Sequence, residues 1–101
     1  MKIEISPTNI KLDEALLVWI EKKIVSLEKF LKRIDPGAVE ARIEIGKPSK
    51  HHKKGMVWYA EVNLKLPGKL LRATNTNKDL RTAINQVKDE LQKQIEKYLR
   101  K

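Results

Sequence analysis

The segment at residues 46–55 contains the side chains of this sequence that could most readily do chemistry. It carries His51 and His52 among several lysines. Histidine binds metals and transfers protons near neutral pH. A metal site needs further ligands, yet the segment contains no Cys, Asp or Glu, and its lysines repel cations. We therefore expect no metal site here.

Catalysis has equally little support elsewhere in the chain. Glu14, Glu21 and Glu28 recur every seven residues, which could form an acidic row, but the same spacing is typical of a solvated helix flank. Neither GxxxxGK[ST] nor GxGxxG is present. We expect a protein that is not an enzyme, with no cofactor and no small-molecule substrate.

The lysines of the same segment indicate a different activity. The segment joins two expected strands, and it is longer than the roughly two to five residues of an ordinary hairpin. Its cations are Lys47, Lys50, Lys53 and Lys54. We interpret it as a basic finger that becomes ordered on phosphates. The alternative is a solvated hairpin tip with no partner.

The composition of the whole chain favours a polyanionic partner. The 101 residues include 22 Lys and Arg against 13 Asp and Glu, a formal net charge of +9. Such an excess is typical of nucleic-acid-binding domains. There is no cysteine, no apolar leader and no run of about 18 apolar residues. We expect a single domain over residues 1–101, soluble and cytoplasmic, with no membrane partner.

Hydrophobic periodicity predicts strands and helices in an α+β order. Alternating apolar residues predict strands, and apolar residues every three or four positions predict helices. The expected strands lie at residues 2–6, 39–45, 56–66 and 69–74. The expected helices lie at residues 14–33, after an Asp13 cap, and 78–98, after an Asn77 cap. Both apolar helix stripes can cover one face of a four-stranded sheet.

Two basic rows follow from the helical spacing. The first helix carries Lys22, Lys29 and Arg33. The second carries Lys93, Lys97, Arg100 and Lys101, with Arg81 and Lys88 on its other flank. Each row could follow a phosphate backbone. The alternative is intrahelical pairing, because Asp89 precedes Lys93 and Glu96 precedes Arg100 by four residues.

Three aromatic residues could stack on bases. Trp58 follows the inward alternation of its strand, so we expect it in the core. Tyr59 is expected on the open face of the sheet, and Trp19 at the edge of the first helix's apolar stripe. None of the three defines a site.

Four short strings, in order, resemble the ribosome hibernation promoting factor and ribosome-associated inhibitor family, once described as sigma-54 modulation proteins. The strings are Asp13-Glu14-Ala15-Leu16, Leu27-Glu28-Lys29-Phe30, Leu66-Pro67-Gly68 followed by Leu71-Arg72-Ala73, and Asp79-Leu80-Arg81-Thr82-Ala83-Ile84-Asn85. The resemblance implies a β-α-β-β-β-α fold, similar in layout to double-stranded-RNA-binding domains. It also implies binding to the rRNA of the small ribosomal subunit, where mRNA and tRNA would lie, and silencing of the ribosome in starvation.

The resemblance implies an rRNA-binding role for basic residues of both helices, which by position are Lys22, Lys29, Lys88, Lys93, Lys97 and Arg100. Arg81 replaces the family's usual aromatic residue, Glu90 stands where relatives often have lysine, and the segment from Lys47 to Lys54 is longer than in several short members. With Lys101 as its last residue, the chain is expected to be a monomer away from the ribosome, without a second domain for pairing ribosomes. A free double-stranded-RNA-binding module and a protein-interaction domain remain alternatives.

Overall fold

The computed structural model describes residues 1–8, 10–47 and 57–100. Its elements are β1 (Lys2–Thr8), α1 (Glu14–Val25), the 3-10 helices η1 (Ser26–Phe30) and η2 (Pro36–Ala38), β2 (Glu40–Gly46), β3 (Trp58–Leu66), β4 (Lys69–Asn77) and α2 (Leu80–Leu99). The strands form one sheet in the order β1-β2-β3-β4. β1 pairs with β2 in parallel, and the other pairs are antiparallel. The predicted α+β order is confirmed.

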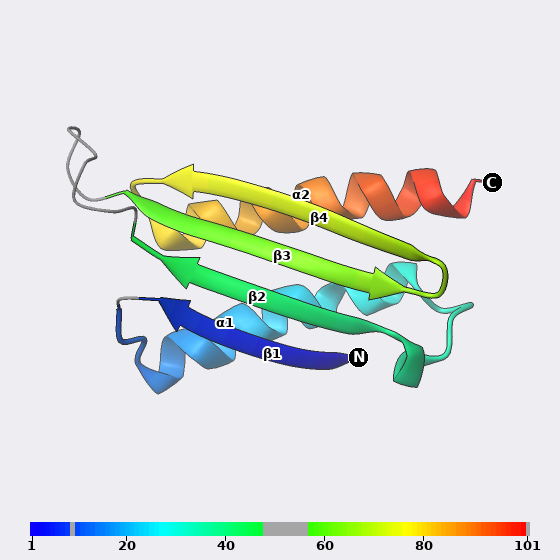
Figure 1. The fold of residues 1–101 in the computed structure, drawn as a ribbon, viewed down its shortest axis with the longest axis horizontal. Helices are drawn as coiled ribbons and strands as arrows, with labels where there is room; N and C mark the ends of the chain where they lie inside the picture. Colours follow the sequence, from blue (N-terminus) through cyan, green and yellow to red (C-terminus); the bar gives the residue numbers. More distant parts are fainter. Residues whose placement is uncertain (9, 48–56, 101) are drawn as a thin grey trace.

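Both helices lie behind one face of the sheet, α1 behind β1 and β2 and α2 behind β3 and β4 (Figure 1). The core between these two layers is apolar throughout the described residues. Its largest fully buried side chains include Ile20 and Ile24 of α1, Ile43 of β2, Leu64 of β3 and Leu91 of α2. The other face of the sheet is left open. The fold therefore presents two distinct surfaces, an outer helix face and an open sheet face.

The edge strand β1 is longer than predicted. Pro7 was expected to end it, but the strand continues to Thr8 and Pro7 stands opposite Ile45. Proline has no N–H to donate, which an edge strand tolerates because it pairs on one side only. β1 pairs only with β2, so the missing donor costs no bond to a second neighbour.

The first helix is shorter than predicted and changes its geometry. Asp13 caps α1 by accepting a hydrogen bond from the Leu16 N–H at 2.7 Å, but α1 ends at Val25 instead of continuing to residue 33. There the Ser26 hydroxyl donates to the Lys23 carbonyl, which is a local bond of the kind that competes with helical pairing. The chain then tightens into η1. The cations after Ser26 therefore do not follow α-helical spacing.

The second helix begins at a different cap from the one predicted. β4 runs to Asn77, and Asp79 is the N-cap of α2, accepting from the Thr82 N–H at 3.2 Å. Asn77 instead accepts from the Asp79 N–H at 3.0 Å. An acidic cap suits the positive end of a helix dipole. Hydrogen bonding to Thr82 correspondingly lowers the pKa of Asp79.

Candidate nucleic-acid interface

The open sheet face balances its charges. Cross-strand register and alternation place Lys2, Arg42, Lys65 and Arg72 on this face with Glu4, Glu40, Glu44 and Glu61. Four of these residues form two ion pairs. Arg42 Nε lies 3.2 Å from Glu40, and Arg72 Nη2 lies 2.9 Å from Glu61. The net positive charge of the chain therefore belongs to its other parts.

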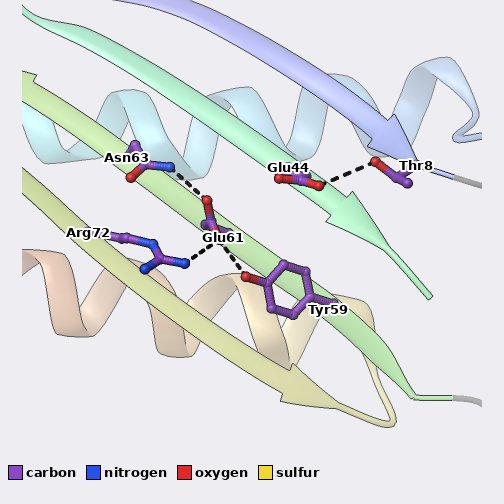
Figure 2. Close-up of polar contacts among 6 residues, drawn as sticks. All are labelled: Thr8, Glu44, Tyr59, Glu61, Asn63 and Arg72. Atoms are coloured by element: carbon purple, nitrogen blue, oxygen red, sulfur yellow. Dashed lines mark hydrogen bonds and ion pairs between the residues drawn. The ribbon is translucent and has the colours of Figure 1, made fainter. Parts of the chain in front are cut away.

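Glu61 is the centre of the polar network on that face. Its carboxylate accepts hydrogen bonds from Arg72, from the Tyr59 hydroxyl and from Asn63 Nδ2 at 2.8 Å (Figure 2). The bonds from Arg72 and Tyr59 lower the pKa of Glu61 from 4.5 to about 2. The same carboxylate raises the pKa of Tyr59. A group ionised so firmly is a poor proton donor at neutral pH, so this network is structural.

The helix face carries cations that are not neutralised in this way. The exposed members of the predicted set are Lys22, Lys29, Arg33, Arg81, Lys93, Lys97 and Arg100. Within the described ranges, none of them forms an ion pair with a carboxylate. Glu28 is 3.8 Å from the Met1 amino group, so it lies on the flank of the first helical segment toward β1.

Because of η1, the three cations of the first predicted basic row lie at two separate sites on the surface. Lys29 and Arg33 lie together with Lys32 around a hollow that also contains Phe30 and Leu99. Lys22 borders a different hollow, beside Val18 and Glu21. The prediction of one continuous row was therefore wrong, because it assumed α-helical spacing through residue 33. The structure instead brings Lys29 and Arg33 to the last turn of α2.

Arg81 links the two helices at their N-terminal halves. Its Cζ lies 4.9 Å from the centroid of the Trp19 ring, and Lys23 Nζ lies 5.5 Å from the same centroid. Trp19 is half-buried and packs against the core. An arginine stacked on an aromatic ring keeps the edge of its guanidinium available for phosphate. Trp19 thus holds two cations near each other, Lys23 of α1 and Arg81 of α2.

The intrahelical ion pairs considered as the alternative to a basic row in α2 do not form among the described residues. Asp89 lies 3.5 Å from Lys88 Nζ, not beside Lys93, and Glu96 accepts from Gln92 Nε2 at 3.1 Å, not from Arg100. Lys88 is half-buried. The three cations Lys93, Lys97 and Arg100 are consequently left exposed along the outer, C-terminal part of α2.

Two hydrogen bonds fix this end of α2, one to β4 and one to the β3–β4 turn. Gln94 Nε2 donates to the Arg72 carbonyl at 2.9 Å, and the Tyr98 hydroxyl donates to the Pro67 carbonyl at 3.1 Å. The carbonyl groups of an edge strand otherwise need other partners. These contacts set the rotation of α2, so the cations of its outer side stay away from the sheet.

Lys47 is the one cation of the predicted basic finger that lies within the described residues. Its Nζ lies 5.0 Å from the Trp58 ring centroid, and Trp58 is half-buried against the core where we predicted a core position. Tyr59 lies on the open face, as predicted. The predicted contacts Lys50, Lys53 and Lys54, and both histidines, lie outside the described residues, as does Lys101.

The exposed cations of the helix face are suited to contacts with phosphates. Among residues 1–8, 10–47 and 57–100, no three His, Cys, Asp or Glu side chains come together as metal ligands. Over the same residues, no helix has the length and apolar character needed to cross a bilayer.

Comparison with known protein families gives a match over residues 3–101 to the model described as Sigma 54 modulation protein / S30EA ribosomal protein. The chain belongs to this family. The resemblance predicted from four short strings is therefore confirmed. The match includes both helices, β2, β3 and β4 in full, and all of β1 except its first residue.

Curated relatives of this S30EA family chain are named ribosome hibernation promotion factors. The protein of Staphylococcus aureus (strain COL) is 31% identical over 98 residues, which are 97% of this chain and 48% of the relative. The Lactococcus lactis protein is 29% identical over 98 residues, 97% of this chain and 49% of the relative. The Deinococcus radiodurans protein is 23% identical over 95 residues, 94% of this chain and 47% of the relative. The chain thus spans about half the length of these relatives.

Solved structures share the fold of the S30EA family chain. The N-terminal domain of Protein Y from Thermus thermophilus superposes with a TM-score of 0.78 at 25% identity, covering 97% of this chain and 99% of that one. A ribosomal subunit interface protein from Coxiella burnetii superposes with a TM-score of 0.74 at 24% identity, covering both chains in full. The similarity to the Coxiella burnetii protein concerns the fold alone.

Sequence reasoning missed two cations of this S30EA family chain. Lys23 reaches the Trp19 ring, and Lys32 lies beside Lys29 and Arg33. Lys23 could have been found from its spacing of four residues after Trp19, which places the two side chains on one helix flank. Lys32 could not, because its position depends on η1.

Proposed function

We propose that this domain is a ribosome hibernation factor that binds rRNA of the small ribosomal subunit through its helix face. Bound there, it occupies space that mRNA and tRNA need, and it makes or breaks no covalent bond. The domain acts as one unit over residues 1–101, as a monomer away from the ribosome, in the cytoplasm. The names of the curated relatives support the general role.

The observation that carries the proposal is the difference between the two faces. Seven exposed cations of the helix face form no ion pair among the described residues, whereas the open sheet face matches its four cations with four carboxylates. Phosphate backbones supply anions at regular spacing, and their neutralisation releases counterions. A face whose exposed cations form no described ion pair is suited to docking on folded RNA.

Binding is expected to be specific for small subunits and steeply dependent on salt. With roughly six to ten phosphate contacts, affinity should fall about 10³- to 10⁵-fold between 50 and 200 mM salt. Sedimentation with purified small subunits, large subunits and a plain RNA duplex measures this. An mRNA- and tRNA-binding assay on the same small subunits tests the blocking.

Three results would count against the proposal. Equal affinity for the plain duplex would instead indicate a free double-stranded-RNA-binding module. Binding that is insensitive to salt would indicate a protein partner. Undisturbed mRNA and tRNA binding on subunits saturated with the domain would contradict the blocking mechanism.

A further inference from the structure

A hollow of about 350 Å³ lies where η1 meets the last turn of α2. Phe30 and Leu99 supply its apolar surface, and Lys29, Lys32 and Arg33 surround it. Its volume is at the lower end of the roughly 300–1,000 Å³ typical of small-molecule sites. No carboxylate lines it. An apolar surface surrounded by cations is thus open to solvent on the helix face.

Leu99 distinguishes this hollow from the others. Three large hydrophobic side chains of the described residues are exposed: Val18 at 44%, Leu70 at 59% and Leu99 at 42%. The hollow beside Val18 also contains Glu21, and the hollow beside Leu70 contains Glu40. Neither contains an aromatic ring. Of these three places, only that of Leu99 combines an aromatic ring with cations and without a carboxylate.

We propose that this hollow takes one unstacked nucleobase of the rRNA, an inference that rests on the proposed function. The flat, apolar faces of a base match Leu99 and Phe30, and the phosphates on either side of its nucleotide match Lys29, Lys32 and Arg33. Proteins commonly recognise RNA through bases that have left the stack and lie against aromatic or apolar side chains. Lys29 Nζ already lies 5.2 Å from the Phe30 ring centroid, so a cation is held beside the apolar surface.

Substitution of Leu99 with alanine tests the inference on the ribosome. L99A is expected to bind small subunits about fivefold more weakly, because the contact of the base with the leucine side chain is lost. The dependence of its affinity on salt should equal that of the wild type, since no cation is removed. The matched control is L70A, the same substitution on the open sheet face, which should bind as the wild type does.

If L99A, L70A and the wild type bind subunits with equal affinity, the inference that the hollow takes a base is wrong, while the proposed function stands. If the wild type itself does not bind subunits, the proposed function is contradicted instead. Both substituted side chains are exposed, so thermal unfolding should confirm that both variants fold as the wild type does.

A titration with short RNA separates a base from other occupants. In NMR spectra of the wild type, adenosine tetranucleotide is expected to shift the Leu99 methyl and Phe30 ring signals by ring-current effects, with the Leu70 methyl signals unchanged. An abasic tetranucleotide should leave the Leu99 signal nearly unmoved, although it can still contact the cations. Equal shifts with both oligonucleotides would mean that only phosphate binds. No shift with either would mean that the hollow takes no nucleobase, and both of these results overturn the inference.

Discussion

Replacing both Lys93 and Lys97 with glutamate is expected to weaken binding to small subunits by at least about 100-fold at low salt. Both side chains are exposed on the outer part of α2 without a described carboxylate partner, so the change removes two cations and places like charges near phosphate. The slope of log affinity against log salt should fall by about two. Thermal stability should change little, since surface substitutions usually alter it by less than about 0.5 kcal/mol.

The matched control reverses two cations on the other side of the molecule. Lys2 and Lys65 are exposed on the open sheet face, and their replacement with glutamate changes the net charge by the same amount. Sedimentation with small subunits should show nearly wild-type binding for this variant. If both double variants lose the same affinity, total charge governs binding and the helix face has no special role.

Replacing Glu61 with glutamine is expected to lower the free energy of unfolding at pH 7 by about 1–2 kcal/mol. The carboxylate accepts from Arg72, Tyr59 and Asn63, and its side chain is only 15% exposed. A glutamine amide offers one acceptor and adds a donor that faces other donors. The exposure of the Arg72 side chain, 61%, keeps the effect modest because solvent screens the pair.

The effect of Glu61 should depend on pH in a defined direction. Its pKa is 4.5 when unperturbed and about 2 in the folded chain. The stabilisation is therefore fully present above about pH 4.5, falls as the pH decreases toward 2, and is absent below it. Denaturant unfolding of wild type and E61Q at several pH values measures the difference.

Glu44 provides a control on the same face. It stands opposite Glu61 in the β2–β3 pairing, and among the described residues its carboxylate accepts a single long bond, from the Thr8 hydroxyl at 3.5 Å (Figure 2). Like charges in directly opposed positions destabilise a sheet. E44Q is therefore expected to be neutral or slightly stabilising. Equal destabilisation by E44Q and E61Q would contradict the assigned role of the Glu61 network.

Elements with a strong local pattern were predictable from the sequence. The alternation of β2 and β3 and the apolar spacing of α2 identify the buried side of each element without tertiary information. Pro67 and Gly68 mark the β3–β4 turn, where Gly68 has a φ of +72° that favours glycine. These patterns sufficed to give the strand and helix order and the two faces.

Features that depend on tertiary or competing local contacts were not predictable in the same way. The end of α1 depends on a hydrogen bond between Ser26 and Lys23 that helical periodicity does not encode. The hollow around Leu99 depends on η1 meeting a helix far along the chain. The ion pair of Asp89 was also not predicted, because Asp89 pairs with the adjacent Lys88 and not with Lys93, which lies four residues later on the helix.

Lysine footprinting on the wild-type chain tests most directly which face docks on the ribosome. Lysines occur on both faces, so acetylation followed by mass spectrometry can compare the free domain with its complex with small subunits. We expect Lys22, Lys29, Lys93 and Lys97 to be protected in the complex, and Lys2 and Lys65 to react as they do in the free domain. Protection of Lys2 and Lys65 with continued labelling of the helix face would contradict the account.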